Sequence, residues 1–246
     1  MKQFKGTEDY IIADLAHVIH PLTLPGKTNG VIFVEGHGTK LKDTNGKEYL
    51  DFTSGLVNVN IGHGRTEVAD AAYAQMKKFE FHTIFWGLSH TAVIECASKL
   101  AELTPDGLKR FFFCSGGSEA NETAIKFARL FWRANGADKY KIISLQNSYH
   151  GVSFGPLSAT ALGRETYQRQ VEPLLPGFTS IPSFYCYRCS FGKTYPGCGF
   201  DCAHALEDAI QREGAGTVAA FIAEPVQGSA GMVVPPPEYW PLARQI

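Results

Sequence analysis

The pattern of hydrophobic and polar positions changes its period near residue 110. Before that point, short alternating runs over 31–52 surround Asn45-Gly46, a strong signal for a two-residue hairpin turn. Apolar positions spaced three or four apart then predict two helices, one beginning near residue 66 and one over 89–103. These patterns predict a small β-containing segment followed by helices.

After residue 110, buried strands are predicted to alternate with helices. Continuous apolar runs are typical of strands buried on both faces of a parallel sheet, and the segments between them have helical periodicity. The predicted strands occupy 110–114, 141–145 and 217–223, and the helices occupy 119–134 and 203–212. The apolar face of the helix over 119–134 carries Ala120, Ala124, Phe127, Ala128 and Phe131. This order predicts an α/β fold with a mostly parallel sheet. We expect an N-terminal segment over 1–65 and the first part of a large domain over 66–246.

Composition narrows the range of functions. The 246 residues carry 23 basic and 24 acidic side chains, a balance that does not resemble a nucleic-acid-binding protein. No apolar run reaches the roughly 18 residues of a membrane-spanning helix, and the N-terminus lacks the apolar core of a secretion signal. These features predict a cytoplasmic protein without nucleic-acid or membrane partners.

Three motifs follow the C-terminal ends of the predicted strands, where open α/β sheets bind ligands. Gly117 and Ser118 join the first strand to a helix, and free N–H groups at a positive helix end can hold a phosphate. Tyr149 and His150 follow the second strand, where an aromatic ring can stack on a flat cofactor. Glu224 follows the third strand, where a carboxylate is costly unless it is paired or functional.

Each motif alone also has a structural explanation. The glycine turn can simply precede a helix cap, an aromatic-His-Gly loop is more often structural, and the glutamate can be a cap or an ion-pair partner. A Walker loop is excluded because no Gly-Lys-Ser/Thr follows, and the G-x-G-x-x-G spacing of a dinucleotide site is absent. The three motifs together nevertheless predict one cofactor site.

Four stretches of the sequence resemble the class-III aminotransferases, which are fold-type-I pyridoxal-phosphate enzymes. These are LKDTNGKEYLDFTSGLVNVNIGHG, SGGSEANETAIKFAR, SYHG and AEPVQG. The resemblance runs from about Gly30 to the last residue and keeps the family's order and spacing. It implies that Gly117 and Ser118 bind the phosphate of pyridoxal 5'-phosphate. It also implies that Tyr149 stacks on the cofactor ring, with His150 beside it.

The same resemblance implies a substrate site and a reaction. Glu224 matches the family's active-site glutamate, which can pair with an arginine late in the chain, and Leu56, Val57 and Phe85 would line the substrate pocket. The implied reaction moves an amino group between an amine or amino acid and a 2-oxo acid, and the intact enzyme is expected to be a homodimer. A racemase, epimerase or lyase of the same fold and a non-catalytic truncated product are the alternatives.

Two chemical groups of the family have no match in this sequence. The Schiff-base lysine and the aspartate that contacts the pyridinium nitrogen are expected beyond residue 246. The chain stops just after a helix begins near Tyr239, which we interpret as truncation. We therefore expect no transamination by these residues alone. Val152 stands where several branches of the family have a carboxylate-binding arginine, which favours amines or ω-amino acids with pyruvate-like acceptors.

Four of the six cysteines crowd into 17 residues. They are Cys186, Cys189, Cys198 and Cys202, with the spacing C-x2-C-x8-C-x3-C. Four soft ligands in this span could form a zinc or iron–sulfur site. The loops are short and aromatic-rich, however, and the resembled family needs no metal for its chemistry. Reduced structural thiols are the favoured interpretation, and no metal site is predicted.

Overall fold

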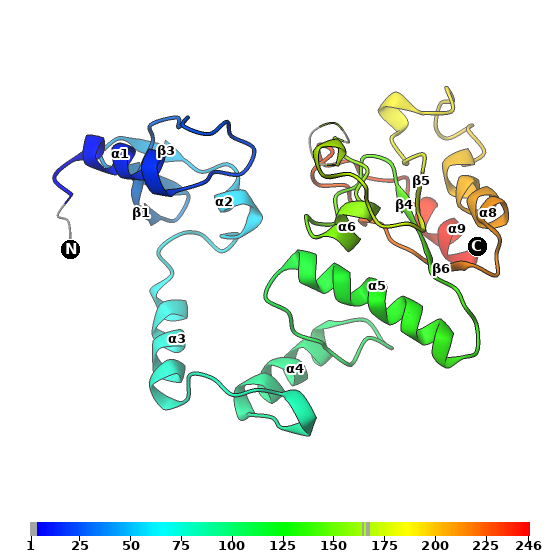
Figure 1. The fold of residues 1–246 in the computed structure, drawn as a ribbon, viewed down its shortest axis with the longest axis horizontal. Coiled ribbons are helices and arrows are strands. Elements are labelled where there is room, and N and C mark those ends of the chain that lie inside the picture. The colour runs from blue at the N-terminus through cyan, green and yellow to red at the C-terminus, as the bar shows by residue number, and fades with distance from the viewer. Residues whose placement is uncertain (1–3, 164, 166–167) are drawn as a thin grey trace. The chain divides into compact units, whose positions relative to one another are not determined.

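The computed structural model describes residues 4–163, 165 and 168–246, and its contacts divide the chain into two units, Met1–Lys99 and Leu100–Ile246 (Figure 1). Residues 1–3 of the predicted N-terminal segment lie outside the described part. The division falls later than the predicted domain boundary after residue 65. That boundary concerns the domains of a complete enzyme and stays a prediction.

The first unit contains a three-stranded antiparallel sheet in the order β1-β2-β3. Its strands are β1 (Phe33–His37), β2 (Lys40–Asp43) and β3 (Glu48–Leu50). The predicted hairpin is confirmed, because β2 and β3 pair on either side of Asn45-Gly46. Its loop is longer than the expected two residues, since the Asp43 N–H donates to the Lys47 carbonyl oxygen and only Gly46 of the Asn45-Gly46 pair has a positive φ, +83°. Asp43 fixes this turn by accepting hydrogen bonds from the N–H groups of Asn45 and Lys47, both at 2.9 Å.

Helices make up most of the remaining regular structure of the first unit. They are α1 (Thr7–His17), α2 (Ser54–Val57), α3 (Thr66–Lys78), η1 (Phe85–Gly87) and α4 (Thr91–Leu103), whose last turn crosses the division. The two predicted helices are confirmed as α3 and α4, although α4 begins two residues later than expected. Neither helix buries a residue, and Asp43 is the only fully buried residue among positions 4–99. An apolar helix face therefore predicted the helices but not their burial.

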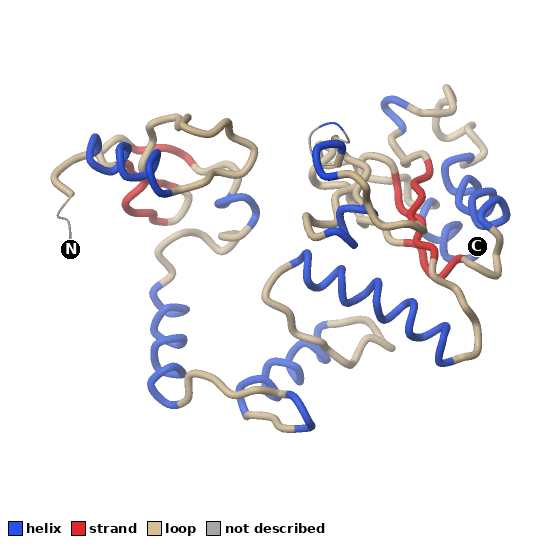
Figure 2. Tube along the Cα trace, viewed as in Figure 1, coloured by secondary structure: helices blue, strands red, loops and turns tan. Residues whose placement is uncertain are grey.

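The second unit is built on a parallel sheet in the order β5-β4-β6. Figure 2 shows the strands in red among the helices of this unit. The strands are β4 (Lys141–Leu145), β5 (Phe178–Ile181) and β6 (Val218–Phe221). The helices are α5 (Gly117–Ala134), α6 (Phe154–Ala159), η2 (Arg169–Val171), η3 (Cys186–Arg188), α8 (Asp201–Glu213) and α9 (Tyr239–Gln245). The predicted α/β class with a parallel sheet is confirmed.

Alternation along β4 buries both faces of this sheet. Ile143 and Leu145 belong to the main core, which also contains Leu206 of α8 and Tyr239 of α9. The intervening Ile142 is also buried but lies outside that cluster, because successive side chains of a strand point to opposite faces. Helix α6 contacts β4 and β5, and α8 contacts β5 and α9 (Figure 1). The sheet therefore has a fixed C-terminal edge, formed by the loops that follow β4 and β6.

The predicted strand over 110–114 is wrong. This run is coil in the structure, and Phe112 within it is exposed. An apolar run indicates burial but does not say which backbone will pair with it, and no described strand pairs with this one. The apolar face predicted for the helix over 119–134 is not the face that α5 buries. Phe127 and Phe131 on it are exposed, whereas Ile125 is buried and α5 contacts α6 and β6.

No helix in the described part of the chain is long and apolar enough to span a bilayer.

Candidate cofactor site

Ser118 lies in the first turn of α5 and contacts the loop that follows β4. Helix α5 begins at Gly117, and the Ser118 hydroxyl oxygen accepts a hydrogen bond from the Val152 N–H at 3.0 Å. Gly151 allows this approach, because a Cβ built on it would lie 2.6 Å from Ser118 Oγ and its φ is +137°. The sequence therefore brings the predicted phosphate turn and the aromatic loop together at one edge of the sheet.

The beginning of α5 has the features of an anion site. Backbone N–H groups in the first turn of a helix have no acceptor within the helix, and the helix dipole is positive at this end. Gly116 and Gly117 border open space, since a Cβ built on either would meet no atom within 4 Å. Glu119 stabilises the turn before α5 by accepting a hydrogen bond from the Ser115 N–H at 2.9 Å. The glycines leave room for a phosphate at the helix end.

Glu224 joins the loops after β4 and β6. Its Oε1 accepts a hydrogen bond from the Tyr149 N–H at 2.8 Å, and its Oε2 accepts one from the Gly228 N–H at 3.1 Å. The cost of placing a carboxylate after an apolar strand is offset by these two donors. A carboxylate has about four lone-pair positions, so Glu224 keeps capacity for a further donor.

His150 is buried beneath the loop surface. Its N–H donates to Thr160 Oγ1 at 2.9 Å, and its carbonyl oxygen accepts from Asn121 Nδ2 at 2.7 Å. The ring Nε2 is buried and has no hydrogen-bond partner among the described residues. Burial lowers the pKa of the His150 imidazole from 6.5 to about 4, so the ring is neutral at pH 7. The polypeptide around His150 thus connects α5, the loop and the end of α6.

Residues of the first unit were also predicted at the site. Leu56 and Val57 lie in the short turn α2, and Phe85 begins η1. All three side chains are exposed. Their assignment to a substrate pocket stays a prediction.

The comparisons with known proteins agree with this geometry. The sequence profile of class-III aminotransferases matches residues 25–246. The chain belongs to the class-III aminotransferase family. It is 36% identical to the putrescine–pyruvate aminotransferase of Pseudomonas aeruginosa over 216 residues, which cover 87% of this chain and 47% of that relative.

Solved transaminases have the same fold. An (S)-enantioselective omega-transaminase from Thermomicrobium roseum matches with a TM-score of 0.93 and 43% identity, over 99% of this chain and 55% of that one. The omega transaminase of Pseudomonas jessenii in complex with PMP matches with a TM-score of 0.89 and 33% identity, over 95% and 52%. The chain spans about half the length of the relatives it matches. The family depends on pyridoxal phosphate, which agrees with the predicted cofactor.

The class-III residues in this chain fit the phosphate end of that cofactor. The open space beside Gly116 and Gly117 and the hydroxyl of Ser118 lie at the same helix end. The C-terminal edge of the sheet brings Tyr149 and Glu224 within one hydrogen bond of each other. This helix end therefore has the space and the donors that a phosphate group requires.

Three residues without a predicted role support the site. Glu122 Oε2 accepts hydrogen bonds from Ser153 Oγ at 3.1 Å and from the Gly155 N–H at 3.2 Å. Buried Gln227 donates to the Gln146 carbonyl oxygen at 2.9 Å. Asn121 holds the His150 carbonyl oxygen. Asn121 and Glu122 lie in SGGSEANETAIKFAR and Gln227 in AEPVQG, so the polar residues of those stretches were the available signal.

The cysteine-rich segment lies in the second unit. Cys186 begins η3 and Cys202 lies in the first turn of α8, and all four cysteines are free thiols. Among the described residues, no three His, Cys, Asp or Glu side chains are arranged to hold a metal ion. Burial, followed by the nearby thiols of Cys186 and Cys198, raises the pKa of Cys202 to about 11. Whether the cysteines remain metal-free thiols stays a prediction, which metal analysis of the purified protein would test.

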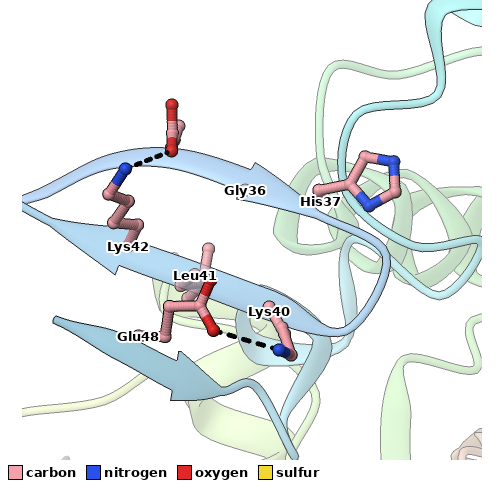
Figure 3. A pocket seen from close by; sticks show the side chains of 7 residues that line it. Gly36, His37, Lys40, Leu41, Lys42 and Glu48 are labelled. Atoms are coloured by element: carbon pink, nitrogen blue, oxygen red, sulfur yellow. Dashed lines mark hydrogen bonds and ion pairs between the residues drawn. The ribbon is translucent and has the colours of Figure 1, made fainter. Parts of the chain in front are cut away.

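A hollow on the small sheet of the first unit has a different character. Figure 3 shows Lys40 paired with Glu48 and Lys42 paired with a neighbouring carboxylate across this surface. The two ion pairs span 3.0 and 3.1 Å, and all four side chains are exposed. Exposed ion pairs of this kind contribute little stability, and each charge here is already matched by an opposite one. We assign no ligand to this hollow.

Proposed function

We propose that these residues form the phosphate-binding part of the active site of a class-III transaminase. The observation that carries the proposal is the contact between the first turn of α5 and the loop after β4, at the Ser118 Oγ–Val152 N distance of 3.0 Å. It joins the phosphate turn to the Tyr149 loop at the edge of a parallel sheet where such folds bind ligands.

The individual roles follow from the chemistry of each group. The N–H groups of Gly117 and Ser118 and the Ser118 hydroxyl would hold the cofactor phosphate. The Tyr149 side chain would pack against the pyridine ring, with buried His150 supporting the loop. Glu224 accepts the Tyr149 N–H, and its carboxylate would face the substrate end of the site. When bound, pyridoxal phosphate supplies an electron sink for the substrate amine.

The exposed Val152 supports a preference among substrates. An apolar side chain there cannot form the bidentate contact that an arginine makes with a carboxylate. We therefore propose an amine or ω-amino acid as donor and a pyruvate-like 2-oxo acid as acceptor. The putrescine–pyruvate aminotransferase relative is named for a pair of this kind.

We further propose that residues 1–246 alone do not catalyse transamination. Four of the five lysines of the second unit are engaged away from the site, and the fifth, Lys126, is exposed on α5 eight residues after Ser118, about 12 Å along the helix. Lys109 donates to the carbonyl oxygens of Ala101 and Thr104, Lys139 lies over the Trp132 ring, and Lys193 pairs with Asp201. Lys141 begins β4 and pairs with Glu213, at the opposite end of the strand from Tyr149. The amine that captures the cofactor would then come from outside these residues.

The exposed apolar helix faces support a larger assembly. Contiguous exposed apolar surface is unusual for a protein without a partner. We propose that further residues of a complete enzyme and a second subunit cover the outer faces of α3 and α5, giving a cytoplasmic homodimer. No role in binding nucleic acid or a membrane is proposed.

The test is a transamination assay on the complete reading frame, with primary amines as donors and pyruvate or 2-oxoglutarate as acceptors. We expect kcat/KM for pyruvate to exceed that for 2-oxoglutarate at least about tenfold. Val152→Arg should lower this ratio, because the arginine can bind the second carboxylate of 2-oxoglutarate. The matched control is Val171→Arg, an exposed valine in η2. Absence of amino transfer from any primary amine would contradict the proposed function.

A further inference from the structure

The loop between β3 and α3 contains a left-handed turn, which is an unusual conformation for its residues. Ser54, Gly55, Leu56 and Val57 have φ values of +49°, +59°, +62° and +64°. Only glycine adopts this region readily, and a β-branched residue such as valine is a clear outlier there. Such backbone persists only where the surrounding structure determines it.

Asp51 holds this backbone conformation from the N-terminal side of the turn. Its Oδ1 accepts hydrogen bonds from the N–H and the hydroxyl of Thr53, both at 3.0 Å. Its Oδ2 accepts one from the Gly55 N–H at 2.8 Å, inside the left-handed segment. A single carboxylate thus orients the backbone directly before Leu56.

His63 fixes the Asp51 carboxylate in place. His63 Nε2 lies 2.8 Å from Asp51 Oδ2, and the Asp51 side chain is only 5% exposed. The hydrogen bond from His63, together with those of Thr53 and Gly55, lowers the pKa of Asp51 to about 2, so it is charged at neutral pH. His63 is itself held by β1, because a Cβ built on Gly36 would lie 2.8 Å from its ring. The Asp51–His63 pair therefore connects the small sheet to the left-handed turn.

The far side of the turn is closed by Asn58. Its Nδ2 donates to the carbonyl oxygens of Gly55 at 3.2 Å and Leu56 at 3.1 Å. The result is a rigid turn whose Leu56 and Val57 side chains are 79% and 63% exposed. Backbone strain and exposed apolar side chains together point to a recognition surface rather than to a packing role.

We propose that Asp51, held by His63, is the positioning residue that fixes the left-handed turn and thereby sets which amine donors Leu56 and Val57 accept. The proposal rests on the proposed transaminase function, because it assumes that these two side chains face the donor. Asp51 itself touches neither substrate nor cofactor in this assignment.

The first arm of the test measures amide hydrogen exchange in the purified protein. Asp51→Asn keeps the size of the side chain but removes its charge and one acceptor. We expect exchange at Gly55 to become at least about tenfold faster, because its N–H loses a hydrogen bond to a charged group. Val57 and Val59 donate to the carbonyl oxygens of Thr53 and Ser54, and their exchange should become faster to a similar degree as the turn loosens. Unchanged exchange at these amides would overturn the proposal.

Asp43→Asn is the matched control. Asp43 is also a shielded carboxylate with several donors, but it holds the hairpin turn through Asn45, Lys47 and Tyr49. We expect Asp43→Asn to speed exchange at Asn45 and Lys47 and to leave Gly55 and Val57 unchanged. Equal acceleration of the left-handed turn by both variants would mean general loosening and would also overturn the proposal.

The second arm measures donor selectivity in the complete enzyme. We expect Asp51→Asn to change the ratio of kcat/KM for a bulky aryl amine over a small alkyl amine at least about tenfold, and Asp43→Asn to leave it within twofold. Faster exchange without a change in this ratio would overturn the proposal. A wild-type enzyme that transfers no amine would contradict the transaminase function instead, and the exchange arm would still decide whether Asp51 positions the turn.

Discussion

Ser118 combines two roles at a single residue, since its hydroxyl accepts the Val152 N–H and its backbone belongs to the first turn of α5. Loss of the hydroxyl should therefore affect the phosphate more than the ring of the cofactor. We expect Ser118→Ala to weaken binding of pyridoxal phosphate about tenfold, the equivalent of one charge-assisted hydrogen bond. An absorbance titration measures the dissociation constant.

Two comparisons make this test specific for Ser118. Pyridoxal, which lacks the phosphate, should bind the Ser118→Ala variant and the wild type equally. Ser158→Ala removes a hydroxyl whose acceptor is the Phe154 carbonyl oxygen, and it should leave both affinities unchanged. An equal loss of affinity for pyridoxal and pyridoxal phosphate would contradict the phosphate role.

His150 should make stability depend on pH. Burial lowers the pKa of its imidazole from 6.5 to about 4, so the unfolded chain binds the proton more tightly than the folded one. The free energy of unfolding should therefore fall as the pH falls from about 6.5 to about 4, with no contribution from His150 above that window.

We expect His150→Gln to flatten the pH dependence between pH 6.5 and 4. Urea unfolding of both proteins at several pH values measures the difference, and the carboxyl groups that titrate in both proteins cancel in it. Parallel pH profiles for the wild type and the variant would show that the imidazole is not held neutral by burial.

The burial of the His150 side chain could not be predicted from the sequence. The pattern predicted that the Tyr149-His150-Gly151 loop follows a strand, because the predicted strand over 141–145 ends shortly before it. A loop has no fixed side-chain alternation, and the backbone of His150 is held by Thr160 and Asn121, which lie 10 and 29 residues away in the sequence. Its expected place beside the cofactor ring stays a prediction.

At the level of elements, Gly151 controls how closely the loop approaches α5. A Cβ on this residue would lie 2.6 Å from Ser118 Oγ and 3.0 Å from Pro156 Cβ, at a φ that side chains rarely adopt. We expect Gly151→Ala to lower the free energy of unfolding by about 1–3 kcal/mol through overpacking and strain. Denaturant unfolding measures this change.

Gly216→Ala provides the control for Gly151→Ala. A Cβ at Gly216 meets no atom within 4 Å, so the control adds the same methyl group without a clash. We expect its free energy of unfolding to stay within about 0.5 kcal/mol of the wild type. Equal destabilisation by the two variants would contradict a close approach specific to Gly151.

Elements held by local signals could be predicted from the sequence, and elements that need a distant partner could not. The hairpin at Asn45-Gly46 follows from the turn residues alone, and β4 and β6 follow from apolar runs that the sheet buries. The run over 110–114 is also largely apolar but has no pairing strand among the described residues. The left-handed turn at Leu56 and Val57 had no signal either, because it is imposed by Asp51 against their own backbone preference.

At the level of the whole molecule, the main apolar core lies in the second unit. Its buried cluster joins β4, β5 and β6 to α8 and α9, whereas α1, α3 and α4 bury no residue. The phosphate turn and the Tyr149 loop belong to this better-packed unit. The chain should therefore keep its phosphate site even where surfaces proposed to meet other residues stay uncovered.

The most direct test asks whether residues 1–246 bind the cofactor phosphate but lack the lysine that captures the cofactor. The measurement is a titration with pyridoxal phosphate, followed by borohydride reduction and peptide mapping of any lysine adduct. We expect weak, phosphate-dependent binding without a stoichiometric adduct on one lysine and without transamination, because Lys139, Lys141 and Lys193 are engaged away from the site. A stoichiometric adduct on one specific lysine, together with measurable amino transfer, would contradict the account.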